Sequence, residues 1–459
     1  MNGIPTNLSE YKKYIEIRES HLADYATKSE QAILFDAKTS DEYYREKFDK
    51  SEDHVTLDRY RFRTLFQLDR DRILYSSYFL RLAQKTQLFT SQNMLVETRL
   101  SHTIRVSQIS RSLCMGLRLN QDLAEAIALG HDIGHVPFAH RGERSLANWL
   151  NKKIGYENIQ PELTIGDDLP VLLKIQPQHR EAVRAYFTLG NDPEEEIFMH
   201  GRHSFRLLAI KNKEARKGKF TRQVLFGIWR HSLSAKQYDS IFRYKTIDSE
   251  NNICEISGKD LTPECQVVRY ADDISTILDL VEGMENGFVS AKEIQDELNG
   301  FAPDEDYLGA SIPQLFYDFS RVNVSRLLTY FISDFIGTNL LRLEQGNGAA
   351  NMSLSERAEK ALNILRNITK VRLHSSAPLS RGDKVSESRI YALCDWYDKN
   401  PNHLILDIKN KMKEPEFPYV LSQNEFDRIL LNNIYKYSII TDFISMLTDQ
   451  EVRRLSEPL

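Results

Sequence analysis

Apolar residues recur at helical spacing along most of this chain, and the residues that interrupt helices are scarce. The sequence of 459 residues contains 20 glycines and 14 prolines. In one segment an apolar residue stands about every four positions, as an amphipathic helix requires: Leu100, Ile104, Ile109, Leu113 and Leu117. The spacing predicts an all-α protein.

Other segments extend this prediction. A second helix is expected over residues 121–135, where Asn120 or Asp122 can cap the first turn. Short alternating pieces on either side of 248–252 predict one small β-hairpin. Further helices are expected near 64–87, 203–212, 222–233, 264–282, 322–342, 354–369, 386–398 and 424–447.

The length of the chain exceeds the comfortable size of one hydrophobic core, so we expect more than one structural part. We predict an N-terminal helical segment over 1–60, a helical core over 61–340 and a C-terminal helical lobe over 341–459. Within the core, 151–199 is rich in charge, proline and glycine and is expected to be an insertion. Residues 344–355 are expected to link core and lobe, with Ser353 or Ser355 capping the next helix.

The composition excludes several classes of protein. With 41% hydrophobic and 27% charged residues, the chain is too apolar for disorder. No run approaches the roughly 18 apolar residues of a membrane helix, and the N-terminus lacks the pattern of a signal peptide. The four cysteines are scattered without a CxxC pair, which is typical of reduced thiols, so we expect a cytoplasmic protein. A net charge of −5 does not favour bulk binding of nucleic acid.

The stretch GHDIGHVPFAH at 130–140 concentrates three histidines beside an aspartate. On a helix, His131 and His135 share a face, and the adjacent Asp132 can reach a metal at its edge. Two or three protein ligands do not make a stable metal site, and other segments must therefore contribute. His102 and Asp272 each interrupt an apolar helical face, which costs stability unless the polar group is paired or ligating.

Two imidazoles and two carboxylates suit a divalent ion such as Mn, Fe, Co, Ni or Zn, and Mg under some conditions. The alternative for each histidine alone is a hydrogen-bonded core residue, which is the commoner role. The ordered occurrence of all four candidate residues on separate expected helices favours the metal site.

A second pair of residues has the pattern of a catalytic base. Pro137 should end the helix that carries His131 or begin the next one. His140 and Glu143 then lie three apart, within hydrogen-bond reach on one helical turn. A carboxylate behind an imidazole orients it and raises its basicity, as deprotonation of water requires. A solvated surface pair is the alternative.

These motifs together resemble a known family. The ordered residues His102, His131–Asp132 and Asp272 resemble those of the HD-domain metal-dependent phosphohydrolases. More narrowly, 66–89, 98–113, 128–146 and 267–275 resemble deoxyguanosinetriphosphate triphosphohydrolases. The resemblance is dense over 17–150, recurs at 198–232 and 264–282, and is thin beyond about 340.

The resemblance implies hydrolysis of a deoxynucleoside triphosphate, dGTP above all, to the deoxynucleoside and tripolyphosphate. It implies that the four metal candidates hold a divalent ion (Mn, Mg, Co, Fe or Zn). His140 and Glu143 would activate the water that attacks the α-phosphorus. Further residues match the family's substrate contacts: Gln87, Leu88, Arg99, His135, His200 and Arg206.

The chain also departs from the family pattern. The family's tyrosine and aspartate, four and eight residues after the last metal-binding aspartate, are replaced by Thr276 and Leu280, with Asp279 one position early. Gly201 and His203 replace the usual Asn and Gln after His200. GHVPFAH stands in place of the commoner GHxPFGH. These changes concern the sugar and base contacts more than the metal.

The sequence is also compatible with two other functions. One is an HD phosphohydrolase that acts on another nucleotide. The other is a regulator with weak catalysis that binds nucleotides or single-stranded nucleic acid, against which the His140–Glu143 pair argues. The resemblance further implies a homo-oligomer, with a hexamer favoured, and leaves open a nucleotide or single-stranded DNA as effector.

Overall fold

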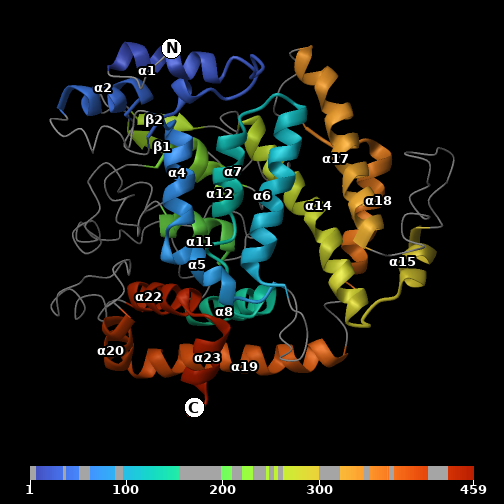
Figure 1. Cartoon of the computed structure of the whole chain (residues 1–459). Helices are drawn as coiled ribbons and strands as arrows, with labels where there is room; N and C mark the ends of the chain where they lie inside the picture. The colour runs from blue at the N-terminus through green and yellow to red at the C-terminus, as the bar shows by residue number, and fades with distance from the viewer. Residues whose placement is uncertain are drawn as a thin grey trace.

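The structure is a computed structural model of the chain, and the part of the chain that it describes is mostly helical (Figure 1). This confirms the predicted all-α class. The residues that it describes are 7–34, 38–50, 62–87, 97–154, 198–208, 220–230, 244–247, 253–256, 262–298, 321–345, 352–369, 371, 377–411 and 433–458.

The first half of the described chain contains α-helices and two short 3-10 helices. These are α1 (Leu8–Arg18), η1 (Ser29–Gln31), α2 (Ser40–Lys50), α4 (Leu65–Leu74), α5 (Ser77–Arg81), η2 (Leu82–Gln84), α6 (Arg99–Gly116), α7 (Gln121–Gly130), α8 (Ala139–Ile154), α11 (His200–Arg206) and α12 (Arg222–Arg230).

The second half adds a hairpin and further helices. These are β1 (Tyr244–Ile247), β2 (Ile253–Ile256), α14 (Pro263–Glu285), α15 (Ala291–Leu298), α17 (Arg321–Glu344), α18 (Glu356–Ile368), α19 (Ala377–Lys399), α20 (Pro401–Lys411), α22 (Asn433–Met446) and α23 (Asp449–Ser456). Strands β1 and β2 pair antiparallel, with Tyr244 opposite Ile256, which confirms the predicted hairpin.

Helix starts follow the capping chemistry of the sequence. The Asn120 side chain accepts hydrogen bonds from the first backbone N–H groups of α7, and Ser355 caps α18, so both predicted caps are confirmed. Thr98 forms a capping box at the start of α6. Thr262 caps α14, and Pro263 follows at the first helical position, where its missing N–H carries no penalty.

The core lies where α6, α7, α4, α12 and α14 pack together in the middle of the molecule (Figure 1). Helix α7 is the most enclosed of them, because its sequence QDLAEAIALG offers small and aliphatic side chains to neighbours on several sides. Small residues also permit close packing: a Cβ on Gly130 would overlap Ile228 of α12. Helices α6 and α14 and the residues directly after α7, which carry the predicted metal ligands, thus meet in the middle of this core.

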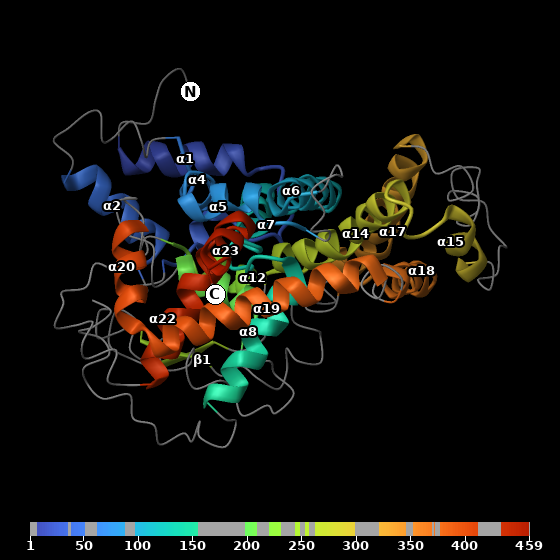
Figure 2. The ribbon, with the colours of Figure 1, turned by 90° about the horizontal axis from the view of Figure 1, so that it is seen from below.

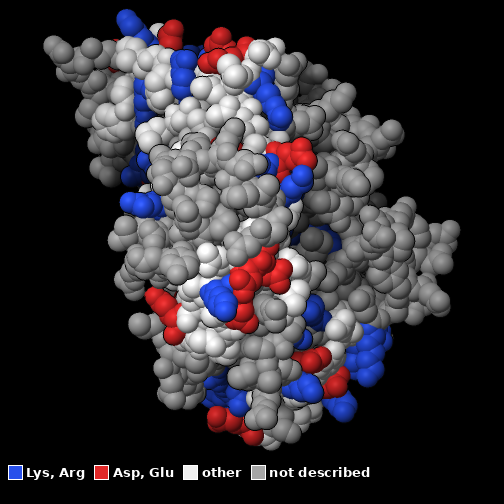
Figure 3. All heavy atoms as spheres, turned by 90° about the vertical axis from the view of Figure 1, so that its right-hand side faces the viewer, with Lys and Arg blue, Asp and Glu red and all other residues white. Residues whose placement is uncertain are grey.

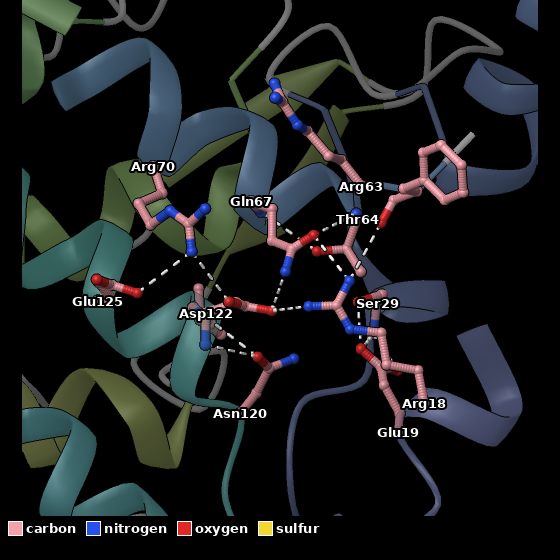
Figure 4. A network of polar contacts seen from close by, with 12 residues as sticks. Arg18, Glu19, Ser29, Arg63, Thr64, Gln67, Arg70, Asn120, Asp122 and Glu125 are labelled. Atoms are coloured by element: carbon pink, nitrogen blue, oxygen red, sulfur yellow. Dashed lines mark hydrogen bonds and ion pairs between the residues drawn. The ribbon is translucent and has the colours of Figure 1, made fainter. Parts of the chain in front are cut away.

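A polar network attaches the N-terminal helix to this core (Figure 4). Asp122, in the first turn of α7, accepts hydrogen bonds from Arg18 of α1 and from Gln67 and Arg70 of α4. Arg70 also contacts Glu125, one turn further along α7. Each charged group therefore has opposite charge or a hydrogen bond beside it, as half-buried polar groups require.

The C-terminal helices pack beneath α8, where α19 crosses it (Figure 2). The Trp149 indole N–H of α8 donates to Asp395 of α19 at 2.9 Å, and Lys153 Nζ lies 2.8 Å from Asp398. Helices α17 and α18 pack instead on α14. The domain boundaries at 60 and 340 stay predictions.

Some sequence expectations need correction. The helical region near 64–87 is broken, because Ser76 caps a new helix, α5, after α4 has ended. Ile104 is 46% exposed, so the buried face of α6 is rotated from the predicted one and includes His102 and Val106. Of the predicted insertion at 151–199, the first four residues continue α8, and 155–197 lie outside the described residues.

Lysine and arginine side chains alternate with aspartate and glutamate over the described part of the face in Figure 3. Among the described residues, no helix combines the length and apolar character needed to cross a membrane.

Candidate metal centre and catalytic histidines

Four predicted ligands converge from three parts of the helical core. His102 lies on α6, His131 and Asp132 follow directly after α7, and Asp272 lies on α14. His102 Nε2 is 3.1 Å from Asp272 Oδ1 and 3.7 Å from Asp132 Oδ2. His131 Nε2 is 3.3 Å from Asp132 Oδ1 and 3.7 Å from Asp272 Oδ1. Ligand atoms of His102, His131 and Asp132 all lie within 4.8 Å of one another.

The hydrogen bonding of His131 orients it as a ligand. Its Nδ1 lies 2.6 Å from the backbone carbonyl of Ala128, which can only accept, so Nδ1 carries a proton. Neutral His131 therefore presents the lone pair of Nε2 to two carboxylates. That arrangement is repulsive unless a cation stands between them, so the donor set fits a divalent ion.

Without a metal, a proton can take that place. Burial lowers the pKa of His131, but Asp132 and Asp272 outweigh it and raise the pKa to about 9. Burial likewise raises the pKa of Asp132, but the charges of His131 and Arg99 help to overcome this, and the pKa is held well below its usual range. For Asp272, hydrogen bonds from His102 and His131 lower the pKa against burial. The carboxylates are ionised and the site attracts cations.

Two stacked histidines extend from the metal cluster. The rings of His135 and His200 lie 3.8 Å apart and nearly parallel. His135 Nε2 is 3.4 Å from Asp132 Oδ1, and His200 Nε2 is 4.0 Å from the same atom. Burial lowers the pKa of His135 well below its usual range, with Arg99 and His200 adding to the effect. His135 is therefore neutral beside Asp132.

Glu143 lies beyond the two stacked rings and contacts both His200 and His140. Its Oε1 accepts the backbone N–H of His200 at 2.7 Å and lies 3.0 Å from His200 Nδ1. Its Oε2 is 3.4 Å from His140 Nδ1. Burial raises the pKa of Glu143, but His200 and His140 outweigh it and hold the pKa well below its usual range. The predicted His140–Glu143 contact exists, but the shorter bonds of Glu143 go to His200, which the sequence did not indicate.

The chain between the two clusters is not helical, contrary to expectation. Helix α7 ends at Gly130, residues 131–134 form turns, and α8 begins only at Ala139, so Pro137 lies between two helices. Close approaches fix this segment: a Cβ on Gly134 would lie 2.3 Å from the backbone of Ser204, and one on Gly142 1.9 Å from the carbonyl oxygen of Pro137. Phe138 and Ala139 have positive φ angles of 64° and 54°.

The other predicted substrate contacts are placed unevenly. Arg99 is buried and binds Asp132 Oδ2 through Nη1 at 2.8 Å, while its Nη2 lies 3.4 Å from the Gln87 carbonyl. This brings Arg99 and Gln87 to the edge of the metal cluster. Leu88 lies outside the described residues. Arg206 belongs to α11, but its side chain is outside the described part of the chain.

Several residues at the site were missed by the sequence interpretation. Ser275 Oγ lies 3.4 Å from His102 Nδ1, on the side away from the carboxylates. Ser204 accepts the backbone N–H of Gly134 and donates to the His131 carbonyl. Lys85 and Asp449 hold the turn before α8 from the other side. Lys85 stands within the family-like segment 66–89, whereas nothing in the sequence marked Asp449.

Comparison with known proteins agrees with this geometry. Residues 99–277 match the family model described as HD domain. A deoxyguanosinetriphosphate triphosphohydrolase-like protein of Clostridium tetani is 27% identical over 386 residues, 82% of this chain and 87% of that protein. Another, from Desulfatibacillum aliphaticivorans, is 32% identical over 234 residues, half of each protein. One from Caldanaerobacter subterraneus is 50% identical over 108 residues, 23% of this chain and 31% of that protein. Residues 99–277 are thus similar to the HD domain family, and over most of its length the chain is similar to a protein named deoxyguanosinetriphosphate triphosphohydrolase-like.

Proposed function

We propose that this HD-domain hydrolase converts deoxynucleoside triphosphates, with dGTP as the foremost candidate, to the deoxynucleoside and tripolyphosphate. The observation that carries the proposal is the row of side chains running from Asp132 through His135 and His200 to Glu143 and His140. It joins a cation-binding cluster to an imidazole with a carboxylate behind it. A site that only binds nucleotides has no need of such a base.

The charge of the site suits a polyphosphate. A triphosphate carries close to four negative charges, so cationic groups must offset them when it enters a buried site. Arg99 can offer guanidinium N–H groups to phosphate oxygens, and His200 is a second candidate. Burial lowers the pKa of His200, but Glu143 outweighs it and raises the pKa, which favours the charged imidazole.

His140 is the group best placed to take a proton from water. Because the Glu143 carboxylate accepts from Nδ1, the proton sits on Nδ1 and Nε2 is the basic nitrogen. The His140 side chain is 47% exposed, so water reaches it, whereas His135 and His200 are more enclosed. Arg99 would stabilise the charge that develops on the α-phosphoryl group.

A divalent ion held by His102, His131, Asp132 and Asp272 would act as a Lewis acid toward phosphate oxygens and lower the pKa of water. Positioning of that water by His140 is the contribution of the chain. Tripolyphosphate is a good leaving group, so alignment and electrostatic stabilisation are the main requirements.

The positions expected to contact the sugar and base differ from the family pattern. Leu280 is fully buried in α14, and the Thr276 hydroxyl donates to the Asp273 carbonyl. Neither supplies the contact expected of the family's aspartate or tyrosine. His203 is buried against Ser445 of α22. The bases accepted by this enzyme therefore need direct measurement.

The test is an assay of the purified protein with each dNTP, alone and in mixtures, in Mg, Mn and Co, with all phosphate products resolved. We expect tripolyphosphate and deoxynucleoside in equal amounts. Pyrophosphate with a monophosphate, or free phosphate, would instead identify a different HD phosphohydrolase. Binding without turnover under every metal would support the regulator.

Assembly and effectors are part of the same proposal. We infer from the resemblance a homo-oligomer, a hexamer before other sizes, and an effector nucleotide or single-stranded DNA as an open partner. Light scattering of the metal-loaded protein, with and without each dNTP, measures both the size and its dependence on ligand.

A further inference from the structure

The turn that leads into α8 is held in an unfavourable backbone conformation. Phe138 and Ala139 are consecutive residues with a Cβ, and both have φ in the left-handed region, at 64° and 54°. Such residues avoid this region because Cβ crowds the backbone, and single residues persist in it only when surrounding contacts impose it. Ala139 immediately precedes His140, so the conformation of this turn sets where the first turn of α8 points.

Asp449, more than 300 residues away in the sequence, binds this turn directly. Its Oδ1 accepts the backbone N–H of Phe138 at 3.0 Å. Its Oδ2 accepts both the backbone N–H and the hydroxyl of Thr86. The Asp449 side chain is buried, and all three partners are donors. A carboxylate can only accept when ionised, so it suits this position better than an amide of the same shape.

A second residue, Lys85, binds the other end of the same turn, at His135. Lys85 is 2% exposed, and its Nζ donates to the carbonyl oxygens of His135 at 2.6 Å and Ser445 at 2.8 Å. The chain from His135 to Phe138 is thus tied at both ends to the residues around α22 and α23. These contacts reach the backbone, so they fix conformation without touching the predicted substrate position.

Asp449 is itself held firmly. It is the first residue of α23, whose start is fixed by a capping box between Thr448 and Glu451. Arg81 of α5 contacts both Glu451 and the carbonyl of Met446. The carboxylate therefore approaches the turn from a rigid support rather than from a free chain end.

We propose that Asp449 is a positioning residue for His140: it imposes the left-handed turn at Phe138–Ala139 and so aligns His140 and Glu143 with the metal cluster. The proposal rests on the proposed function in assigning His140 as the base. It makes the C-terminal helices part of the catalytic apparatus, although none of their residues is assigned to the metal or the substrate.

The experiment compares Asp449→Asn with Val452→Ala in the full-length, metal-loaded protein. Val452 is fully buried in the same helix, and its apolar side chain cannot make the hydrogen bonds that hold the turn. Asp449→Asn should lower kcat about 10- to 100-fold, as expected for a base displaced by roughly 1 Å, while bound metal and KM stay near wild type. Val452→Ala should lower the melting temperature and leave kcat unchanged below it.

Hydrogen exchange supplies a readout that does not depend on activity. The Phe138 amide should lose protection in Asp449→Asn and keep it in Val452→Ala, measured on a peptide covering 133–143. If wild type fails to hydrolyse dNTPs but this exchange result holds, the proposed function fails while the restraint on the turn stands. Faster exchange with an unchanged kcat would refute the positioning role.

Backbone strain gives a further control. Glycine adopts positive φ without the Cβ penalty, so Ala139→Gly should make the turn less dependent on its restraint. The kcat loss caused by Asp449→Asn should be several-fold smaller in the Ala139→Gly background than in wild type. Equal losses in the two backgrounds would contradict the proposal that Asp449 acts by holding this turn.

Discussion

The two halves of the candidate site are built by different means. In the metal half, each of the two carboxylates lies within 4 Å of both imidazoles, and the four residues come from segments of the helical core. In the other half, His140 and Glu143 stand at the start of α8, behind a turn whose conformation depends on residues near the C-terminus. The first half is held by core packing and by the cation or proton between its members, and the second half is held by restraints on the backbone.

This difference separates binding from chemistry. Ligand side chains on buried core segments keep their positions even if the surface is altered, because core packing fixes the backbone. A base at a helix start moves with the turn before it. Changes in the metal half should therefore remove the cation and all activity together, whereas changes in the other half should lower the rate and leave the cation bound.

The largest effect is expected from Asp272→Asn. The substitution keeps the shape of the side chain but removes the charge that faces His102 and His131. One of four ligands is lost, so bound metal should fall below detection and kcat/KM by more than about 10³-fold. Metal analysis of the purified variant, beside its turnover of dNTPs, measures both.

The adjacent carboxylate supplies the matched control. Asp273 faces Arg366 of α18 at 3.2 Å rather than the metal cluster. Burial raises its pKa to about 6 against the effect of Arg366. Asp273→Asn should keep full metal occupancy and near wild-type turnover. Loss of metal in this variant too, or full metal occupancy in Asp272→Asn, would contradict the assignment of Asp272 as a ligand.

The next effect concerns the base. His140→Ala should lower kcat about 10²–10⁴-fold, the usual contribution of a positioned base, with metal content and nucleotide affinity retained. Glu143→Ala should lower kcat less, and the double variant little more than His140→Ala, because residues that act as a unit are not additive. Steady-state kinetics measures kcat and KM for each variant, and metal analysis of the same samples measures the bound metal.

His200 makes this test sharper, because it shares Glu143 with His140. His200→Ala should raise KM as well as lower kcat if His200 faces the phosphates. A surface role for the His140–Glu143 pair would leave turnover near wild type in His140→Ala. Metal loss in that variant would show that a ligand had been mistaken for a base.

The sequence predicted the metal half better than the other. His102 and Asp272 interrupt apolar helical faces, and His131 and Asp132 are adjacent in a segment rich in histidine, so the sequence alone marks all four as candidate ligands. The left-handed turn at Phe138–Ala139 has no such signal, because neither residue favours positive φ. The contact between Asp449 and Phe138 depends on how α23 packs, and spacing within one segment carries no information on such a long-range contact. The capping box at Thr448 indicates that a helix starts there, but it does not indicate which segment that helix start contacts.

Proton and metal should compete in the metal half. The folded-state pKa of His131 is raised from 6.5 to about 9, so in metal-free protein its stabilising contribution is complete below pH 6.5 and lost as the pH rises through 9. The shift corresponds to on the order of 3 kcal/mol. Because a metal must displace that proton, its affinity should rise up to about tenfold per pH unit between pH 7 and 9.

Urea unfolding of the metal-free protein between pH 6.5 and 9, with metal titrations at the same pH values, measures this competition. Asp272→Asn is the control, since losing one facing carboxylate should flatten the pH dependence of unfolding. A metal affinity that does not change over this range would show that the cation binds without displacing a proton from His131.

The smallest effect is expected at Ser275, whose hydroxyl contacts the ligand His102 rather than the metal. Its hydroxyl donates to the Asp272 carbonyl at 2.7 Å, so it can only accept from His102 Nδ1, at a long 3.4 Å. This holds the proton of His102 on Nδ1 and directs Nε2 to the carboxylates. Ser275→Ala should therefore weaken metal binding by up to about tenfold and leave kcat at saturating metal unchanged. Thr276 supplies the control, because among the described contacts its hydroxyl bonds only the Asp273 carbonyl. Thr276→Ala should change neither metal affinity nor kcat.

A fall in kcat for Ser275→Ala at full metal occupancy would mean that the geometry of the metal half also sets the rate. The separation of binding from chemistry would then not hold.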